Sequence, residues 1–103
     1  MRDRIVGPPG TRIYSDGRHT VVTFRDRELV RVSYTDIRLD ARGHRDFITQ
    51  ARLNQSSRLL HLDYHVVNRG GIWLVEMSTD AYRFADGMHI LRSIGRDHEY
   101  VRY

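Results

Sequence analysis

RDFITQARLNQSSRLLHL, residues 45–62, is the only long stretch in which apolar residues recur with the period of a helix. One sector of its helical wheel holds Phe47, Ile48, Ala51, Gln55, Leu59 and Leu62, all of them apolar except Gln55. We expect this sector to pack against a sheet. Asp46 is expected to begin the helix as an N-cap, because its carboxylate can accept a hydrogen bond from the amide N–H of Thr49.

A second sector of this helix is wholly polar and comprises Gln50, Asn54, Ser57 and His61. We expect this polar stripe to face water or a partner, since its uncharged groups suit base edges, sugar hydroxyls or a protein surface. Arg52 borders the apolar sector, which predicts a structural role in a salt bridge or in hydrogen bonds to loop carbonyls. Leu53 and Leu60 lie outside the apolar sector, so they are predicted to be exposed or to contact a loop or a second subunit.

Strand-like runs before the helix predict a hairpin. The β-branched run Thr20–Phe24 and the alternating run Glu28–Thr35 flank a turn at Arg25–Arg27. Ile37–Asp40 repeats the alternation and predicts a further strand. Alternation along these runs divides their side chains between two faces. The inner face is expected to hold Val30, Val32 and Tyr34, and the outer face Leu29, Arg31, Ser33 and Thr35.

Two more hairpins are expected after the helix. The first joins His65–Asn68 to Ile72–Met77 through an Arg-Gly-Gly turn that favours positive φ. The second joins Tyr82–Phe84 to Met88–Leu91 through an Ala-Asp-Gly turn of the same kind. Trp73 lies in the most apolar of these strands, which predicts a core tryptophan.

The pattern predicts one α+β domain, in which an antiparallel sheet of five to seven short strands carries one central helix packed on one face. The expected order is β-β-β-α-β-β-β. Residues 1–12 are interpreted as an irregular N-terminal arm with a short edge strand at Ile5–Val6, because Pro8 and Pro9 cannot occupy a central strand. Residues 13–91 form the domain, and residues 92–103 form a C-terminal tail or an edge strand at Tyr100–Tyr103.

Composition excludes several classes of site. The chain of 103 residues has no cysteine, so it has no disulfide and no thiolate ligand or nucleophile. It also lacks an apolar run of the roughly 18 residues that span a bilayer. The N-terminus has no apolar segment typical of a signal peptide, so a soluble, cytoplasmic protein without membrane contact is expected.

Catalytic and metal motifs are weak. Ser56 and Ser57 are outside any nucleophile-elbow context, and the glycine pairs lack the strand-to-helix context of a phosphate loop. His61 and His65 have the four-residue spacing of helical zinc ligands, but the helix is expected to end near His61 and no third ligand is evident. We therefore expect a non-enzymatic protein with no metal and no cofactor.

All seventeen basic residues are arginine, and the net charge is +4. Two explanations stay open, which are codon usage in a GC-rich genome and binding of phosphate groups, to which guanidinium groups are well suited. The candidate nucleic-acid-binding residues precede the helix and are Arg25, Arg27, Arg31 and Arg38. Arg31 and Arg38 are expected to share the outer face of the sheet, with Tyr14 or Tyr82 available for stacking.

The central part of the chain, about residues 20–91, resembles a family of uncharacterised small proteins encoded by tailed bacteriophages and mobile elements. The resemblance rests on Arg45, Thr49, Ala51, Arg52, Leu53, Asn54 and Gln55, on Leu62, Tyr64 and Val66, on Trp73 and Val75, and on Phe84 with Asp86-Gly87-Met88. Members commonly carry threonines and a lysine in the first helical turn, where this chain has Asp46, Ile48 and Gln50. The resemblance implies a phage setting, in the host cytoplasm, and no established activity.

Three functions fit these patterns. The leading hypothesis is a small non-catalytic accessory protein that binds nucleic acid or a nucleotide-like polyanion through its arginines. The second is a protein-binding inhibitor of a host enzyme or defence complex, acting through the polar stripe or an exposed sheet edge. The third is a small homo-oligomeric structural protein with Leu53, Leu60 or the tail in the contact.

Overall fold

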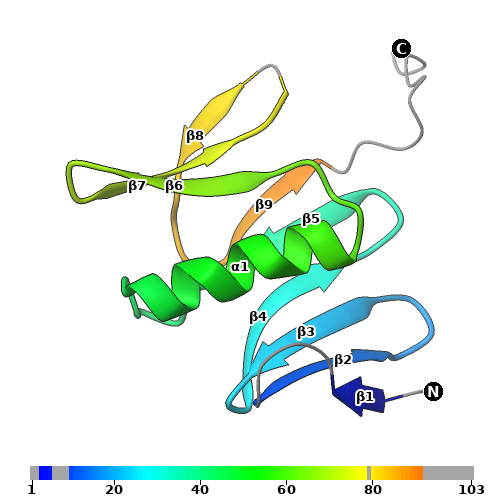
Figure 1. The fold of residues 1–103 in the computed structure, drawn as a ribbon. Coiled ribbons are helices and arrows are strands. Elements are labelled where there is room, and N and C mark those ends of the chain that lie inside the picture. The colour runs from blue at the N-terminus through cyan, green and yellow to red at the C-terminus, as the bar shows by residue number, and fades with distance from the viewer. Residues whose placement is uncertain (1–2, 6–9, 79, 92–103) are drawn as a thin grey trace, which may run out of the picture.

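The computed structural model describes residues 3–5, 10–78 and 80–91, and these residues form one helix and nine strands (Figure 1). The helix α1 spans Phe47–Leu59. The strands are β1 (Asp3–Ile5), β2 (Thr11–Ser15), β3 (Thr20–Phe24), β4 (Arg27–Val32), β5 (Asp36–Leu39), β6 (His65–Arg69), β7 (Ile72–Glu76), β8 (Ala81–Arg83) and β9 (Met88–Leu91).

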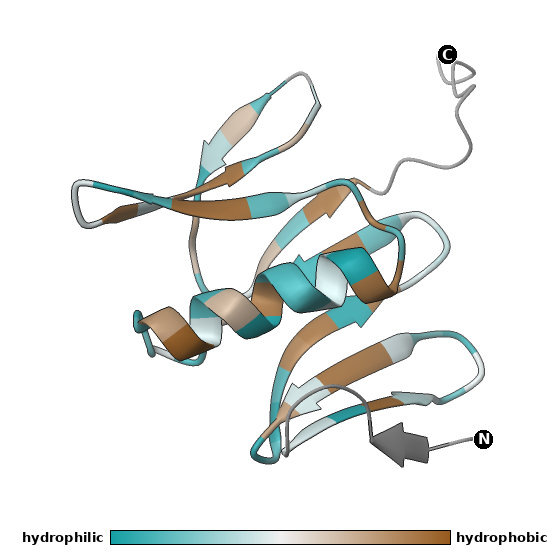
Figure 2. Cartoon of the chain, in the orientation of Figure 1, coloured by the Kyte–Doolittle hydropathy of each residue, from teal (hydrophilic) through white to brown (hydrophobic). Residues whose placement is uncertain are grey.

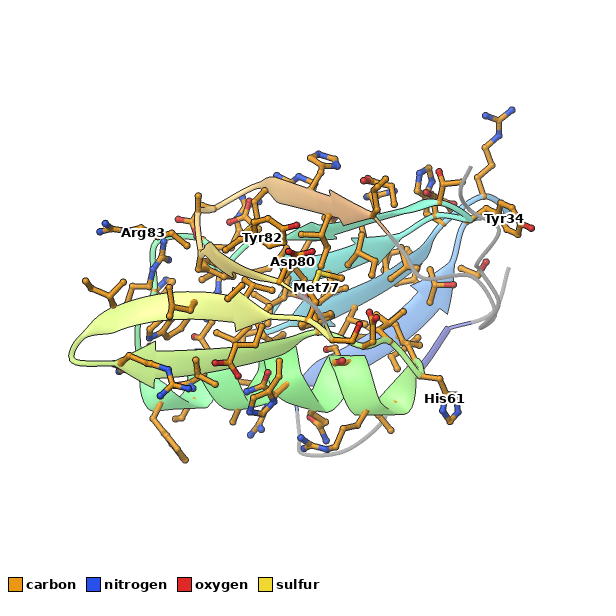
Figure 3. The ribbon with its side chains drawn as sticks, turned by 90° about the horizontal axis from the view of Figure 1, so that it is seen from above. Tyr34, His61, Met77, Asp80, Tyr82 and Arg83 are labelled. Carbon is orange, nitrogen blue, oxygen red and sulfur yellow. The ribbon has the colours of Figure 1, made fainter. Side chains whose placement is uncertain are left out.

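The strands form two antiparallel sheets. Among the described residues, the larger sheet has the order β1-β2-β3-β4-β5-β9 and the smaller has the order β6-β7-β8. Figure 3 shows α1 and the smaller sheet together on one side of the larger sheet. The α+β class is confirmed, whereas the prediction of a single sheet of five to seven strands in the order β-β-β-α-β-β-β is wrong.

The division into two sheets arises at the Asp-Gly turn after β8. Phe84 donates its amide N–H to the carbonyl of Trp73 in the smaller sheet, at 2.9 Å. Gly87 donates its amide N–H to the carbonyl of Leu39 in the larger sheet, at 2.8 Å. The predicted hairpin between Tyr82–Phe84 and Met88–Leu91 is therefore wrong, because the turn carries the chain from one sheet to the other.

The other two predicted hairpins are confirmed. Between β3 and β4, Arg25 and Asp26 both have positive φ, of 51° and 64°, as a two-residue turn with the twist of a hairpin requires. Between β6 and β7, Gly70 and Gly71 take φ values of 65° and 91°, which glycine adopts without steric penalty.

Two residues of the β3–β4 hairpin lie on the opposite face from the one predicted. Register shifts between the pairs Val22↔Val30 and Thr23↔Glu28, so Leu29 is the extra residue of a β-bulge. Leu29 is consequently buried beside Val30, although strict alternation placed it outside. Tyr34 is 72% exposed because β4 ends at Val32 and Tyr34 belongs to the following turn.

The core lies between the larger sheet and the layer formed by α1 and the smaller sheet. Its members include Val22, Val30 and Leu39 from the larger sheet, Leu53 from α1, and Trp73 and Val75 from β7. Trp73 is 4% exposed, which confirms its core position, and its ring meets that of Phe84 edge-on at 5.4 Å between centroids.

The helix is turned the opposite way from the prediction. Its buried residues are Thr49, Leu53, Asn54, Ser56 and Ser57. Of the predicted buried sector, Phe47, Ile48 and Leu59 are exposed, while Leu62, beyond the end of α1, packs against the core. The expectation of a solvent-facing polar stripe is wrong for Asn54 and Ser57, and the expectation of an exposed Leu53 is also wrong.

Hydrogen bonds to β6, the strand at the edge of the smaller sheet, explain this orientation. The Asn54 side chain accepts the amide N–H of Val66 at 2.7 Å and donates to the carbonyl of Val66 at 2.9 Å. Gln50 donates to the same carbonyl at 2.9 Å, and Ser57 donates to the carbonyl of Tyr64 at 2.7 Å. Polar side chains thus cover strand groups that would otherwise be buried without partners.

Both ends of α1 are well capped. The Asp46 carboxylate accepts the amide N–H of Thr49 at 2.7 Å, which confirms the predicted N-cap. At the other end, His61 has a positive φ of 56°, and Leu62 donates its amide N–H to the carbonyl of Ser57. This bond closes a Schellman motif, which redirects the chain toward β6.

At the N-terminus, β1 pairs with β2, where we expected a short edge strand at Ile5–Val6 within an irregular arm. Val6, Pro8 and Pro9 lie outside the described residues, as do the predicted tail at 92–103 and its strand at Tyr100–Tyr103. In the part of the chain that is described, no helix has the length and apolar character needed to cross a bilayer.

Candidate functional site

The solvent side of α1 carries a row of uncharged side chains, which we call the outward helix face and define as Phe47, Ile48, Ala51, Gln55 and Leu59. Phe47 is 81% exposed, Ile48 46% and Leu59 43%. In Figure 2, apolar residues mark both the first and the last turn of α1. Because phenylalanine and isoleucine are usually buried, their exposure together on one face is typical of a contact surface.

Arginines flank this face on both sides. Arg52 lies beside Ile48 and Leu59 at one edge of the outward helix face, and Arg58 lies on the other side of its centre, between Phe47 and Ala51 on the helical wheel. The helix contains these two arginines and no aspartate or glutamate. The outward helix face is therefore an apolar strip with positively charged margins.

Arg52 also joins α1 to the β3–β4 turn. Its guanidinium lies 5.2 Å from the centroid of the Phe24 ring, and the guanidinium of Arg25 lies 4.8 Å from the same centroid. Phe24 itself is only 2% exposed. The predicted salt bridge or carbonyl contacts of Arg52 are thus replaced by a cation–π contact, and the role remains structural.

Arg27 and His44 extend this group toward the beginning of α1. Nη1 of Arg27 lies 3.2 Å from Nε2 of His44, and Nδ1 of His44 lies 4.0 Å from a carboxylate oxygen of Asp46. The pKa of Asp46 is held below its ordinary value, chiefly by the amide N–H of Thr49 and less by the charges of His44 and Arg27. We call Arg25, Arg27, Arg52 and His44 the turn cluster.

Arg31 and Arg38 lie side by side on adjacent strands, as predicted, but carboxylates neutralise both. Glu28 accepts two hydrogen bonds from Arg31, each 2.9 Å long, and lies 3.5 Å from Nη1 of Arg38. Arg38 also pairs with Asp40 at 2.9 Å. The hydrogen bonds and charge of Arg31 hold the pKa of Glu28 below its ordinary value, against the opposing effect of burial.

The four arginines proposed for nucleic-acid binding are therefore divided between two places. Arg25 and Arg27 belong to the turn cluster, while Arg31 and Arg38 belong to the ion-pair network on the outer face of the larger sheet. Tyr14 pairs with Val21, the neighbour of Arg31 in the register, whereas Tyr82 lies on β8 in the smaller sheet. Only Tyr14 shares the larger sheet with Arg31 and Arg38.

The predicted polar stripe does not form one surface. Gln50, Asn54 and Ser57 are bonded to β6 or Tyr64, as described above. His61 is exposed and lies beyond the C-terminal end of α1, where Figure 3 shows it pointing away from the body of the protein. Of the four stripe residues, His61 is the one that is exposed at this surface.

Asp86, in the turn between β8 and β9, links this turn to the loop before α1. Its carboxylate accepts the amide N–H groups of Ala41 at 3.0 Å and Gly43 at 2.9 Å, and it pairs with Nη1 of Arg45 at 2.9 Å. Arg45 in turn lies over the rings of Phe84, at 4.8 Å, and Trp73, at 5.3 Å. These contacts hold the loop before α1 against the β8–β9 turn.

Sequence reasoning identified the residues of the outward helix face but assigned them to the core. A signal was present, because the opposite sector carries Asn54, Ser56 and Ser57, which are short side chains that bond readily to neighbouring backbone groups. For metals, the described residues contain no group of three or more His, Asp or Glu side chains placed to hold an ion.

Comparisons of the chain with protein-family models, with curated proteins and with solved structures found no match. The resemblance to small phage proteins stays a prediction.

Proposed function

We propose that this protein is a protein-binding module whose contact surface is the outward helix face. The exposure of Phe47 carries the proposal, because leaving a phenylalanine in water forgoes roughly 2 kcal/mol of burial free energy. The hydrogen bonds of Gln50, Asn54 and Ser57 to Val66 and Tyr64 fix α1 in this orientation, so the exposed side chains are held on a rigid element. An inhibitor of a host enzyme or defence complex would use such a surface. The phage setting that the resemblance implies is one in which such an inhibitor would act.

Phe47→Ser tests the proposal. We expect the free energy of unfolding to change by less than about 0.5 kcal/mol, since Phe47 is exposed. Binding should fall by about 30-fold or more, the effect of removing an aromatic side chain that contributes strongly to an interface. Proteins retained from cell lysate by the wild-type and variant chains are quantified by mass spectrometry.

Leu91→Ser is the matched control, because Leu91 is 80% exposed but lies on β9 in the larger sheet. It should retain the same proteins as the wild type. If Phe47→Ser and wild type retain the same proteins in equal amounts, the outward helix face is not the binding surface.

The turn cluster supports a second candidate, the binding of nucleic acid or another polyanion. The β3–β4 turn, in which Arg25 and Asp26 adopt the positive φ that a two-residue hairpin turn requires, places Arg25 beside Arg52 on Phe24. Arg31 and Arg38 support the candidate less, because their charges are compensated by Glu28 and Asp40.

Arg25→Glu with Arg27→Glu should abolish binding of single-stranded DNA or RNA in a fluorescence anisotropy titration at low salt, if the turn cluster binds polyanions. Arg31→Glu with Arg38→Glu is the control of equal charge change and should weaken binding much less. Equal losses in the two double variants would indicate attraction by net charge alone, and no binding by wild type would exclude this candidate.

A further inference from the structure

Several arginines of the described chain differ in whether a carboxylate pairs with them. On the sheets and the loop before α1, Arg31, Arg38, Arg42, Arg45 and Arg69 each lie within 4.0 Å of a carboxylate. Around α1, no carboxylate among the described residues pairs with Arg25, Arg52 or Arg58. Arg18 and Arg83 also lack such a partner there, but they lie on other elements.

Buried polar atoms without partners accompany the arginines around α1. Nε of Arg52, Nε of Arg27 and the side-chain oxygen of Gln55 are buried and make no hydrogen bond with the described residues. Arg52 and Gln55 are three residues apart on α1, at the margin and in the middle of the outward helix face. These buried atoms beneath the outward helix face and the turn cluster are therefore less completely paired than the guanidinium groups of Arg31 and Arg38 on the outer sheet face.

The local charge balance around the outward helix face is positive. Arg25, Arg27, Arg52 and Arg58 lie on α1 and around the β3–β4 turn, whose own acidic residues are Asp26 in the turn and Asp46 at the N-cap. The Asp46 carboxylate is already bonded to Thr49. The surface thus combines an apolar centre with a margin of excess positive charge, and an occupant that matches it has the opposite arrangement.

We propose that the outward helix face binds an acidic amphipathic helix of another protein, with apolar side chains on Phe47, Ile48 and Leu59 and carboxylates opposite Arg52, Arg58 and Arg25. This inference depends on the proposed protein-binding function and specifies its partner. The outward helix face runs the length of the 13-residue α1. A partner helix of about the same length, with apolar residues at intervals of three and four, could lie along it and contact Phe47, Ile48 and Leu59.

Charge and composition favour this occupant over two others. A second copy placed face to face by a two-fold axis would set an arginine flank against an arginine flank, whether the two helices run parallel or antiparallel. A lipid surface requires a broad apolar face, whereas Ala51 and Gln55 occupy the middle of this one. A protein helix can place small and polar side chains opposite them.

The test is selection from a display library of random peptides of about 15 residues, long enough for four helical turns. The wild-type chain is the bait and Phe47→Ser is used for counter-selection. Enriched peptides are expected to combine apolar residues at three- and four-residue intervals with an excess of Asp and Glu. One enriched peptide is then synthesised, and its affinity is measured by titration for wild type, Arg52→Glu with Arg58→Glu, and Arg31→Glu with Arg38→Glu.

The expected result is a loss of affinity of at least tenfold in the Arg52–Arg58 double variant, restored when the acidic residues of the peptide are changed to lysine. The Arg31–Arg38 variant should bind the original peptide within about threefold of wild type, since its charges lie on the outer sheet face. Circular dichroism should show the peptide gaining helix on binding.

Other results separate the two proposals. Enriched peptides that are neutral or basic but depend on Phe47 would overturn the acidic partner and leave the binding face intact. No Phe47-dependent peptide would overturn both. A Phe47-dependent dimer in analytical ultracentrifugation, or Phe47-dependent binding to phosphatidylserine vesicles, would identify a second copy or a membrane as the occupant and overturn the acidic helix.

Discussion

Asn54→Leu is expected to lower the free energy of unfolding by about 2–4 kcal/mol, because it leaves both backbone groups of Val66 short of partners. Asn54 is 9% exposed, accepts the Val66 amide N–H at 2.7 Å and donates to the Val66 carbonyl at 2.9 Å. Leucine fills a similar volume, so the loss reports hydrogen bonding rather than a cavity. For a domain of this size, the melting temperature should fall by roughly 10–25 °C.

Urea unfolding followed by the fluorescence of Trp73, the single tryptophan, measures the effect. Gln50→Leu is the matched control, because Gln50 bonds the same Val66 carbonyl but not its amide N–H. It should lower the free energy of unfolding by about 1 kcal/mol or less. Equal losses in the two variants would show that α1 is not oriented by the paired bonds of Asn54 to β6.

Asp86→Asn is expected to lower the free energy of unfolding by about 2–3 kcal/mol at neutral pH. One carboxylate oxygen accepts from Ala41 and Arg45, and the other accepts from Gly43. An amide provides one acceptor and turns an NH₂ group toward a donor, and it removes the charge that pairs with Arg45 above the Phe84 and Trp73 rings. Urea unfolding at neutral pH gives the difference from wild type.

The same variant has a pH dependence with a definite sign. Burial acts to raise the pKa of Asp86, but the amide of Ala41, the guanidinium of Arg45 and the amide of Gly43 outweigh it and hold the pKa below its ordinary value. A depressed pKa contributes stability that is complete above the unfolded pKa of about 4 and is lost as pH falls through the folded pKa.

The stability difference between wild type and Asp86→Asn should therefore be constant from about pH 7 to 5 and shrink below about pH 4. Asp26→Asn serves as the control, because Asp26 is an exposed turn residue, and its difference from wild type should stay within about 0.5 kcal/mol at every pH. A difference for Asp86→Asn that persists unchanged to pH 2 would mean that the carboxylate charge is not what stabilises the turn.

Local sequence signals predicted the parts of the fold that local forces decide. The β-branched run Thr20–Phe24 and the glycines at 70 and 71 specify strands and turns through their own conformational preferences, and both hairpins are present. Asp46 predicts a helix start for the same reason. None of these features needs information about distant residues.

Hydropathy failed for α1 because the helix packs beside a strand edge as well as against a sheet face. A strand edge presents N–H and C=O groups, for which Asn54 and Ser57 are better neighbours than leucine or phenylalanine. The helical wheel weighs apolar content alone, so it assigned the more apolar sector to the interior. The orientation could not follow without knowing that β6 has no strand on that side.

Contacts between residues far apart in the sequence limited the prediction of the remaining features. The Asp-Gly sequence at 86–87 indicates a turn. The amide N–H groups that donate hydrogen bonds to the Asp86 carboxylate belong to Ala41 and Gly43, which are more than forty residues away in the sequence. Arg31 and Arg38 were correctly placed side by side, whereas their neutralisation depends on Glu28, whose position follows from the bulge at Leu29. Spacing in the sequence shows neither relation.

The pairing of β5 with β9 has a consequence for the order in which the protein can fold during synthesis. β5 ends at Leu39 and β9 begins at Met88, so the first five strands leave the ribosome well before the strand that covers the β5 edge. Until then, the backbone groups of that edge are available to another nascent chain. Asp86 emerges just ahead of β9. Its hydrogen bonds to the loop before α1 and the pairing of β9 with β5 therefore form together, as one late step of folding.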